Sequence, residues 1–251
     1  MPAELAQRYK SPAQQARVVS ETWGQENLYC AACASPKLAA TPVGTQVVDY
    51  TCPQCDSAYQ LKSQSRPFSR RITDAAYDAM VRAIRQGRTP NLFALHYDLH
   101  RWAVLNLILV PRFAFSLSCI EKRNPLRTAA ERHGWVGCNI LLGGIPPDAR
   151  IPVVVNGVPN RVASVREQYA RLRPLEKIRY DARGWTLDVL NVVRRLDKKE
   201  FKLGDVYACA GELARLHPQN KNVEPKIRQQ LQRLRDLGFL EFTGRGVYRV
   251  L

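Results

Sequence analysis

Three residues in the first third of the chain have the side chains that phosphodiester hydrolysis needs. Asp49 ends a short apolar run, and Gln60-Leu61-Lys62 begins eleven residues later. Side chains alternate along a strand, so Gln60 and Lys62 would share a face, and an antiparallel pairing would bring Asp49 beside them. A carboxylate can hold a divalent ion that activates water, and a lysine can stabilise charge on phosphate oxygens. An ordinary hairpin with a surface lysine and a capping aspartate explains this short pattern at least as well.

Four cysteines form a second constellation. The pairs Cys30/Cys33 and Cys52/Cys55 each have two residues between them, and 18 residues separate the pairs. A two-residue gap lets a tight turn direct two thiolates at one ion, and two such turns complete a tetrahedral shell with Zn–S near ~2.3 Å. A closed four-thiolate shell predicts a structural zinc site, against the alternative of four unrelated thiols. We expect the other three cysteines to be small buried hydrophobic residues: Cys119, Cys138 and Cys209.

The composition predicts a polyanionic partner. The chain has 251 residues with 38 basic and 22 acidic side chains, a net charge of +16. Nucleic acid fits this charge better than a membrane surface, because the sequence has no apolar run near ~20 residues and the basic residues are spread along the chain. The N-terminal residues lack a signal-peptide pattern, so we expect an intracellular, cytoplasmic protein with no membrane association. No obligate protein partner is evident.

The elements that must position these residues can be placed coarsely. Hydrophobic spacing predicts helices over Ser11 to Asn27 and Asp74 to Gln86, the latter with Asp74 in its first turn. It predicts strands over Gln46 to Tyr50, Ala58 to Lys62, Leu92 to Tyr97 and Trp102 to Val110. The first part is therefore α+β or α/β. We divide the chain into a zinc-containing catalytic domain (1–162), a basic helical connector with loose ends (163–183) and a C-terminal domain (184–251).

The C-terminal domain has the pattern of a winged helix. Helices are predicted over Trp185 to Leu196, Leu203 to Leu216 and Pro225 to Leu237, followed by two short strands around a glycine-rich turn that carries Arg245. The third helix has one buried stripe, formed by Ile227, Leu231, Leu234 and Leu237. Its opposite face carries the residues expected to reach the major groove: Lys226, Arg228, Gln229, Gln230, Arg233 and Arg235. The alternatives are a solvated face or a protein-binding face.

Taken together, these segments resemble the DpnI-like methyl-directed type II restriction endonucleases, which cut GATC when its adenines are methylated. The resemblance covers nearly the whole chain. It is carried by Ser20 to Trp23, the two cysteine pairs, Val47 to Tyr50, Gln60 to Lys62, Phe68-Ser69, Asn91 to Tyr97, Arg132 to Ile140, Arg183 to Asn191, Lys226 to Asp236 and Gly244 to Arg249.

The resemblance implies a PD-(D/E)XK nuclease core with a zinc site and a winged helix, with both domains contacting DNA and sensing 6-methyladenine. The catalytic metal would be Mg²⁺, held by Asp49 and the residue at position 60, and Lys62 would be the lysine of the motif. Trp135 is similar to the tryptophan that lies against the methyl groups, although alone it would be taken for a core aromatic. The protein would act on double-stranded DNA in a prokaryotic cell.

One residue departs from the family pattern. The acidic position of the motif is Gln60 here, whose neutral amide oxygen supplies less charge to hold a cation. Metal affinity could be lower, Glu21 in the first helix could compensate, or the protein could bind methylated DNA without cutting it. We favour an active endonuclease over a catalytically inactive reader or regulator. A generic transcription factor with a zinc ribbon and a winged helix is a third alternative.

Overall fold

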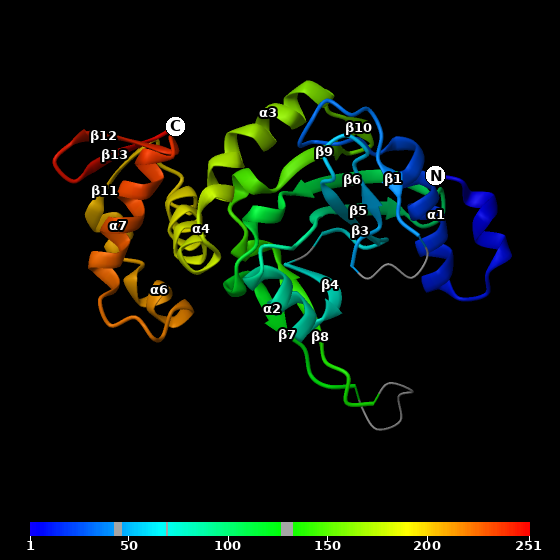
Figure 1. Cartoon of the computed structure of the whole chain (residues 1–251), viewed down its shortest axis with the longest axis horizontal. Coiled ribbons are helices and arrows are strands. Elements are labelled where there is room, and N and C mark those ends of the chain that lie inside the picture. Colours follow the sequence, from blue (N-terminus) through cyan, green and yellow to red (C-terminus); the bar gives the residue numbers. More distant parts are fainter. Residues whose placement is uncertain (43–46, 69, 127–132) are drawn as a thin grey trace.

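The computed structural model describes residues 1–42, 47–68, 70–126 and 133–251 (Figure 1). The helices are α1 (Pro12–Asn27), α2 (Tyr77–Arg85), α3 (Val162–Leu172), α4 (Tyr180–Arg195), α5 (Leu203–Tyr207), α6 (Ala210–Leu216) and α7 (Val223–Asp236). Short 3₁₀ helices are η1 (Ala3–Arg8), η2 (Arg112–Ala114), η3 (Leu117–Cys119), η4 (Leu142–Gly144), η5 (Pro147–Ala149) and η6 (Arg173–Lys177). The strands are β1 (Ala39–Ala40), β2 (Tyr50–Thr51), β3 (Ala58–Gln64), β4 (Arg71–Ala76), β5 (Asn91–Asp98), β6 (Ala103–Val110), β7 (Ile120–Lys122), β8 (Gly137–Leu141), β9 (Ile151–Val155), β10 (Val158–Pro159), β11 (Glu200–Lys202), β12 (Leu240–Gly244) and β13 (Val247–Val250).

A mixed sheet forms the centre of the first part. Its strand order is β1-β2-β3-β5-β6-β9-β10, and β3 and β5 are parallel while the other neighbours are antiparallel. Strand β5 is buried along nearly its whole length, as expected of a strand covered on both faces. The strands expected over Ala58 to Lys62, Leu92 to Tyr97 and Trp102 to Val110 are confirmed, and the first part is α+β.

Different elements cover the two faces of this sheet. Helix α1 reaches β3 through a hydrogen bond between the hydroxyls of Ser20 and Ser63 at 3.0 Å. Helix α3 packs against β9, and Val165 at its start is fully buried. Below the sheet in Figure 1 lie α2 and the antiparallel sheet β4-β8-β7. Successive residues of β3 therefore contact different elements: Ser63 contacts α1, and Lys62 contacts β4 of the second sheet.

Two sequence predictions in the first part are wrong. The segment expected to begin a helix at Asp74 is strand β4, which pairs with β8, and α2 begins only at Tyr77. Asp74 was expected in a helical first turn, where acidic residues are common, but pairing with a distant strand overrides that local signal. The strand expected over Gln46 to Tyr50 starts only at Tyr50, and Val47 has a left-handed φ of 67°. Gln46 lies outside the described residues.

The C-terminal part is a winged helix. Helices α4 to α7 are followed by the wing hairpin β12–β13, and β11 adds a third strand in the order β11-β13-β12. The predicted buried stripe of α7 is confirmed for Ile227, Leu231 and Leu234, which are fully buried, whereas Leu237 follows the end of the helix and is only partly buried. The helix expected over Leu203 to Leu216 is two helices, α5 and α6, which are separated at Ala208 and Cys209.

Helix α4 lies between the two parts of the molecule (Figure 1). It begins at Tyr180, earlier than the predicted Trp185, and is buried continuously from Trp185 to Val193. Two of its side chains bind the first part: Asn191 donates to the carbonyl of Gly143 at 2.7 Å, and Arg194 pairs with Asp148. The segment expected to be a basic helical connector with loose ends (163–183) contains α3 and η6, and Leu172 and Leu175 in these two helices are buried.

Among the residues that the structure describes, we find no helix long and apolar enough to cross a membrane.

Candidate active site and metal centre

Asp49 lies beside β3, as the antiparallel pairing predicted. Strand β2 pairs Tyr50 with Tyr59, and the backbone N–H of Asp49 donates to the carbonyl of Tyr59 at 2.9 Å. Because β2 has only two residues, the N–H of Leu61 donates instead to the Asp49 carboxylate, at 2.7 Å. This contact fixes the aspartate against the Gln60-Leu61-Lys62 segment.

Gln60 and Lys62 share one face of β3, and Tyr59 and Leu61 lie on the other. Gln60 is 5% exposed. Its amide oxygen and the Asp49 carboxylate are the hard donors that Mg²⁺ prefers. The residues present therefore fit a divalent-ion site, with water completing the coordination shell.

Asp74 is a site residue that sequence reasoning missed. Its carboxylate Oδ1 lies 2.8 Å from Nζ of Lys62, and the Asp74 side chain is fully buried while that of Lys62 is 28% exposed. Strand β4, which carries Asp74, belongs to the second sheet. Within the sequence, Asp74 resembles a helix-initiating aspartate, so only the packing of two sheets reveals the pair.

Helix α1 brings Glu21 to the same region. The hydroxyl of Tyr50 donates to the backbone carbonyl of Glu21 at 2.7 Å. Gly24 permits this close approach, because a Cβ at that position would lie 2.4 Å from the Tyr50 hydroxyl oxygen. Glu21 also pairs with Arg17 at 3.4 Å. A third acid is therefore available near Asp49, although the described side chains of Glu21, Asp49 and Asp74 do not form a closed metal cluster.

The acids of this region influence one another. Burial raises the pKa of Asp49, the N–H of Leu61, Lys62 and Arg17 oppose that change, and the charge of Asp74 adds to it. Burial also raises the pKa of Glu21, where Arg17 opposes the change and Asp49 adds to it. Like charges close together disfavour ionisation of each other. A cation binding among these acids would relieve that repulsion.

The four predicted cysteines converge. Their Sγ atoms all lie within 4.8 Å of one another, and the distances Cys30–Cys55 and Cys33–Cys52 are 3.6 and 3.5 Å. Four sulfurs at ~2.3 Å from one ion would be about 3.8 Å apart. Among the described residues this is the one cluster of His, Cys, Asp and Glu side chains that could hold a metal ion, and its donors fit zinc.

Backbone groups around the cluster favour the thiolate form of one cysteine, Cys52. Backbone N–H groups of Ser35 and Gln54 donate to the sulfurs of Cys33 and Cys52, both at 3.4 Å. Burial opposes ionisation of Cys52, but hydrogen bonds from Gln54 and Cys55 lower its pKa to about 6. Burial raises the pKa of Cys30 to about 12. A bound ion would have to displace the Cys30 proton.

Strand β3 links the cysteine cluster to the candidate active site. The hydroxyl of Tyr59 lies 3.2 Å from Sγ of Cys30 and accepts a hydrogen bond from the N–H of Ala31 at 3.1 Å. Gln60 is the next residue and faces the opposite side. Arg166 of α3 holds the same turn by donating to the carbonyls of Cys30 and Ser35, at 3.0 and 2.8 Å. The cluster thus fixes the strand that carries Gln60 and Lys62.

Trp135 lies on the hairpin of the second sheet, half-buried. Its ring lies over Gly137, where an added Cβ would be 2.8 Å from the indole. Strand β8 begins at Gly137, and its Cys138 is opposite Asp74 in β4. Trp135 therefore lies two residues before the strand that pairs with the strand of Asp74. Arg132 and Ser69, which belong to segments of the family resemblance, lie outside the described residues.

The face of α7 expected to meet DNA is largely exposed, with one correction. Arg228, Gln229 and Arg235 are exposed, and Lys226 and Arg233 are partly exposed. Gln230 was expected on this face, but it is fully buried. Its amide oxygen accepts a hydrogen bond from the hydroxyl of Thr186 at 2.8 Å. That residue belongs to α4, so the sequence of α7 gave no sign of it. Gln230 instead supports its neighbours, donating to Gln229 at 3.2 Å.

The wing adds further basic groups beside α7. Arg245 is exposed at the turn between β12 and β13. Arg235 of α7 lies over the ring of Phe242 in β12, 4.5 Å from its centroid, and so joins the helix to the wing. Arg228 donates to the hydroxyl of Tyr207 at 2.6 Å.

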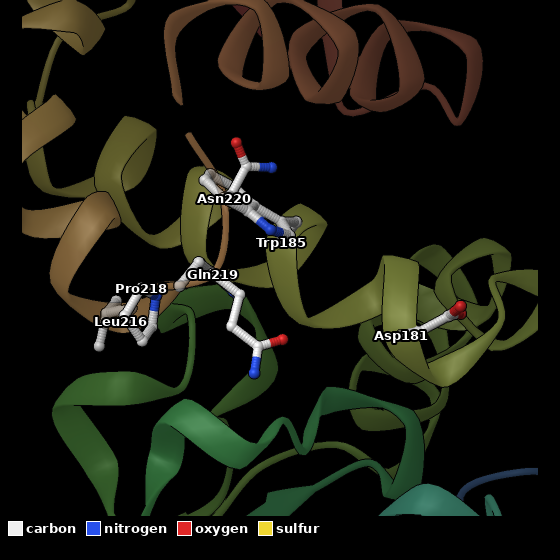
Figure 2. Close-up of a pocket in the computed structure, with 7 residues that line it drawn as sticks. Asp181, Trp185, Leu216, Pro218, Gln219 and Asn220 are labelled. Carbon is white, nitrogen blue, oxygen red and sulfur yellow. The ribbon is translucent and has the colours of Figure 1, made fainter. Parts of the chain in front are cut away.

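A pocket lies between helix α4 and the segment 216–220, which precedes α7 in the sequence (Figure 2). It has a volume of 460 Å³ and is lined by Asp181, Trp185, Leu216, His217, Pro218, Gln219 and Asn220. Trp185 stacks on His217 with 3.9 Å between ring centroids. His217 in turn bonds to Asp188 at 2.8 Å, and Ser118 of the first part bonds to the other oxygen of Asp188 at 2.6 Å. Ser118, Asp188 and His217 thus join the first part of the molecule to the winged helix. The pocket does not include Asp49 or Lys62.

Comparison with protein families agrees with this arrangement. Residues 1–178 match the DpnI model, described as the Dam-replacing family. Residues 181–250 match the DpnI_C model, described as the Dam-replacing HTH domain. The two matches cover nearly the whole chain and confirm the resemblance predicted from the sequence. The chain therefore belongs to the DpnI, or Dam-replacing, family.

Proposed function

We propose that this protein is a methyl-directed DNA endonuclease that hydrolyses phosphodiester bonds in double-stranded DNA containing 6-methyladenine, with methylated GATC as the expected site. Membership of the DpnI family implies a restriction endonuclease, and the helix-turn-helix match implies DNA binding. The observation that carries the proposal is the position of Asp49. Its carboxylate is held by the N–H of Leu61, between the two residues that could complete the catalytic site.

The proposed active site is of the PD-(D/E)XK type. Asp49 and Gln60 would hold Mg²⁺, with Glu21 as an additional oxygen donor. When bound, that ion supplies polarisation of the scissile phosphate and a more acidic water. Lys62 would orient the attacking water or stabilise the negative charge that develops on the phosphate oxygens. The cysteine cluster would hold a structural zinc ion and keep β3 in register with Asp49.

Two surfaces are proposed to hold DNA. Arg228, Gln229 and Arg233 of α7 would enter the major groove, where Arg and Gln can read base edges through paired hydrogen bonds. Lys226 and Arg245 would contact the backbone, and Arg245 would reach from the wing. In the first part, Trp135 would lie against the adenine methyl groups. The half-exposed indole, two residues before the strand that pairs with the strand of Asp74, supports that role.

The decisive experiment is digestion of a plasmid that carries methylated or unmethylated adenines, across a titration of Mg²⁺. We expect double-strand cleavage of the methylated plasmid only. The Lys62→Ala variant, which should bind the methylated duplex without cutting it, is the matched control. Intact methylated plasmid at every concentration of Mg²⁺ and Mn²⁺ would refute the proposed activity.

Gln60 supports a second candidate function, a methyladenine reader or regulator without nuclease activity. A neutral amide in place of a carboxylate weakens the hold on a divalent ion. Gel retardation of a methylated duplex, with no nicking at any metal concentration, would establish this reading. Equal retardation of methylated and unmethylated duplexes would instead indicate a general DNA-binding protein.

A further inference from the structure

The ion pair between Lys62 and Asp74 joins two sheets at the candidate active site. Lys62 comes from β3 of the central sheet, and Asp74 comes from β4 of the second sheet. Nζ of Lys62 lies 2.8 Å from Oδ1 of Asp74. Residues 63–73 separate the two in sequence, and Ser69 among them lies outside the described residues. The contact therefore depends on how the sheets pack and not on local sequence.

Lys62 is the principal partner of the Asp74 carboxylate. The Asp74 side chain is 0% exposed, and within the described part of the chain neither of its oxygens receives a hydrogen bond of good geometry. Removing a carboxylate from water is costly unless a charge of opposite sign compensates it. The ammonium group of Lys62 supplies that compensation, so the position of each side chain depends on the other.

Lys62 would otherwise be a mobile side chain. A lysine has a flexible four-carbon stem and carries its charge as a point, so its position has to be imposed by its surroundings. Its remaining 28% exposure leaves the side chain open to a phosphate that arrives from solvent. The carboxylate of Asp74 is close enough to Asp49 to influence its ionisation, so all three groups belong to one electrostatic site.

We propose that Asp74 is a positioning residue for DNA cleavage, which holds the Lys62 ammonium on the face of β3 where Gln60 and Asp49 meet the scissile phosphate. This inference rests on the proposed nuclease function. Asp74 acts through Lys62 and touches neither DNA nor metal.

The test compares Asp74→Asn with Asp78→Asn. Asp78 is an exposed acid in α2, four residues away, and serves as the matched control. In Asp74→Asn, we expect the single-turnover cleavage rate on methylated DNA to fall by roughly 100-fold, as expected when a catalytic group is misplaced. The affinity for the same duplex, measured without metal, should remain unchanged. A purely structural defect would weaken both, and a rate within twofold of wild type would overturn the proposal.

A second measurement does not require nuclease activity. Reductive methylation with labelled formaldehyde, followed by mass spectrometry of peptides, reports how accessible each lysine is. We expect Lys62 to be protected in the wild type and in Asp78→Asn, and to react several-fold faster in Asp74→Asn. Equal labelling of Lys62 in all three proteins would overturn the positioning role, even if the wild type fails to cut DNA and the proposed function itself is refuted.

Discussion

At the scale of single residues, the candidate active site is a set of charges whose balance depends on position 60. Asp49, Asp74 and Glu21 bring negative charge to a region that contains Lys62 and Arg17. Gln60 adds an oxygen donor without charge. The affinity for a divalent ion should therefore be limited by the charge of the donors and not by their number.

Substitution of Gln60 tests this limit directly. In Gln60→Glu, a carboxylate replaces a neutral amide beside Asp49, so cleavage should reach half its maximal rate at a Mg²⁺ concentration lower by about tenfold, equivalent to about 1.4 kcal/mol. A Mg²⁺ titration of the cleavage rate measures the shift. The matched control is Gln64→Glu, four residues further along the same face of β3, which should not change the titration. An unchanged or weaker Mg²⁺ response in Gln60→Glu would mean that the site has adapted to glutamine.

The buried ion pair makes a second prediction, concerning stability. Lys62→Met leaves the Asp74 carboxylate without its partner, which should lower the free energy of unfolding by roughly 2 kcal/mol, less than for fully buried pairs because water reaches Lys62. Adding Asp74→Asn to that variant should recover most of the loss, since an uncharged side chain needs no partner. Urea denaturation of the three proteins measures this. Additive losses in the double variant would show that the pair is not coupled.

At the scale of elements, β3 and α1 position the chemistry. Strand β3 presents Tyr59 to the cysteine cluster and the next residue, Gln60, to the candidate active site. Helix α1 is held close to β2 by the contact of Tyr50 with the carbonyl of Glu21. The positions of β3 and α1 both depend on backbone geometry. Substitutions away from the charged residues should therefore change how these elements hold the candidate active site.

Removal of metal tests the cysteine cluster. The purified protein should contain one zinc ion per chain, and Cys52→Ser should lose most of it, since fewer thiolates remain to close the shell. Because Cys52 directly follows β2, hydrogen exchange should then increase in 47–62. Metal analysis and exchange mass spectrometry measure both effects, and Cys209→Ser, a cysteine outside the cluster, is the control. Full zinc content in Cys52→Ser would contradict the proposed ligand set.

Gly24 tests the position of α1. In Gly24→Ala, the new Cβ would lie 2.4 Å from the Tyr50 hydroxyl oxygen, so the helix must move away and stability should fall by about 1–3 kcal/mol. Gly211→Ala in α6 is the control, because nothing lies within 4 Å of its added Cβ, and it should be neutral or slightly stabilising. Thermal denaturation distinguishes the two. A stable Gly24→Ala protein would mean that α1 is not held in this way.

At the scale of the whole molecule, α4 joins the nuclease-like part to the winged helix. It packs on α5 and α7 within the winged helix and on α2 and η3 of the first part. Asn191 and Arg194 reach the first part, and Asp188 bonds to Ser118 there. A helix buried on both sides should make the two parts unfold together.

Two adjacent arginines test this coupling. Arg194 pairs with Asp148 of the first part, whereas Arg195 pairs with Glu212 inside the winged helix. Arg194→Ala should weaken the junction, so that calorimetry resolves two unfolding transitions and limited proteolysis cuts near residues 173–180. Arg195→Ala should keep a single transition. Identical behaviour of the two variants would contradict a junction held by Arg194.

The sequence by itself determined the features that depend on local spacing. The cysteine pairs, the alternation of Gln60 and Lys62, the buried stripe of α7 and the family segments could all be identified from residue order. Each follows from short-range geometry, such as the two-residue period of a strand or the 3.6-residue period of a helix.

Only the tertiary structure decided which distant residues meet. Asp74 was expected to start a helix, yet it lies in a strand and holds Lys62, because pairing with β8 outweighs a local helix signal. Gln230 was expected to face DNA, yet Thr186 of α4 buries it. In each case the partner lies on another helix or strand. A buried polar group is stable only when it is paired, so that partner determines where the side chain lies. No pattern within one segment carries that information.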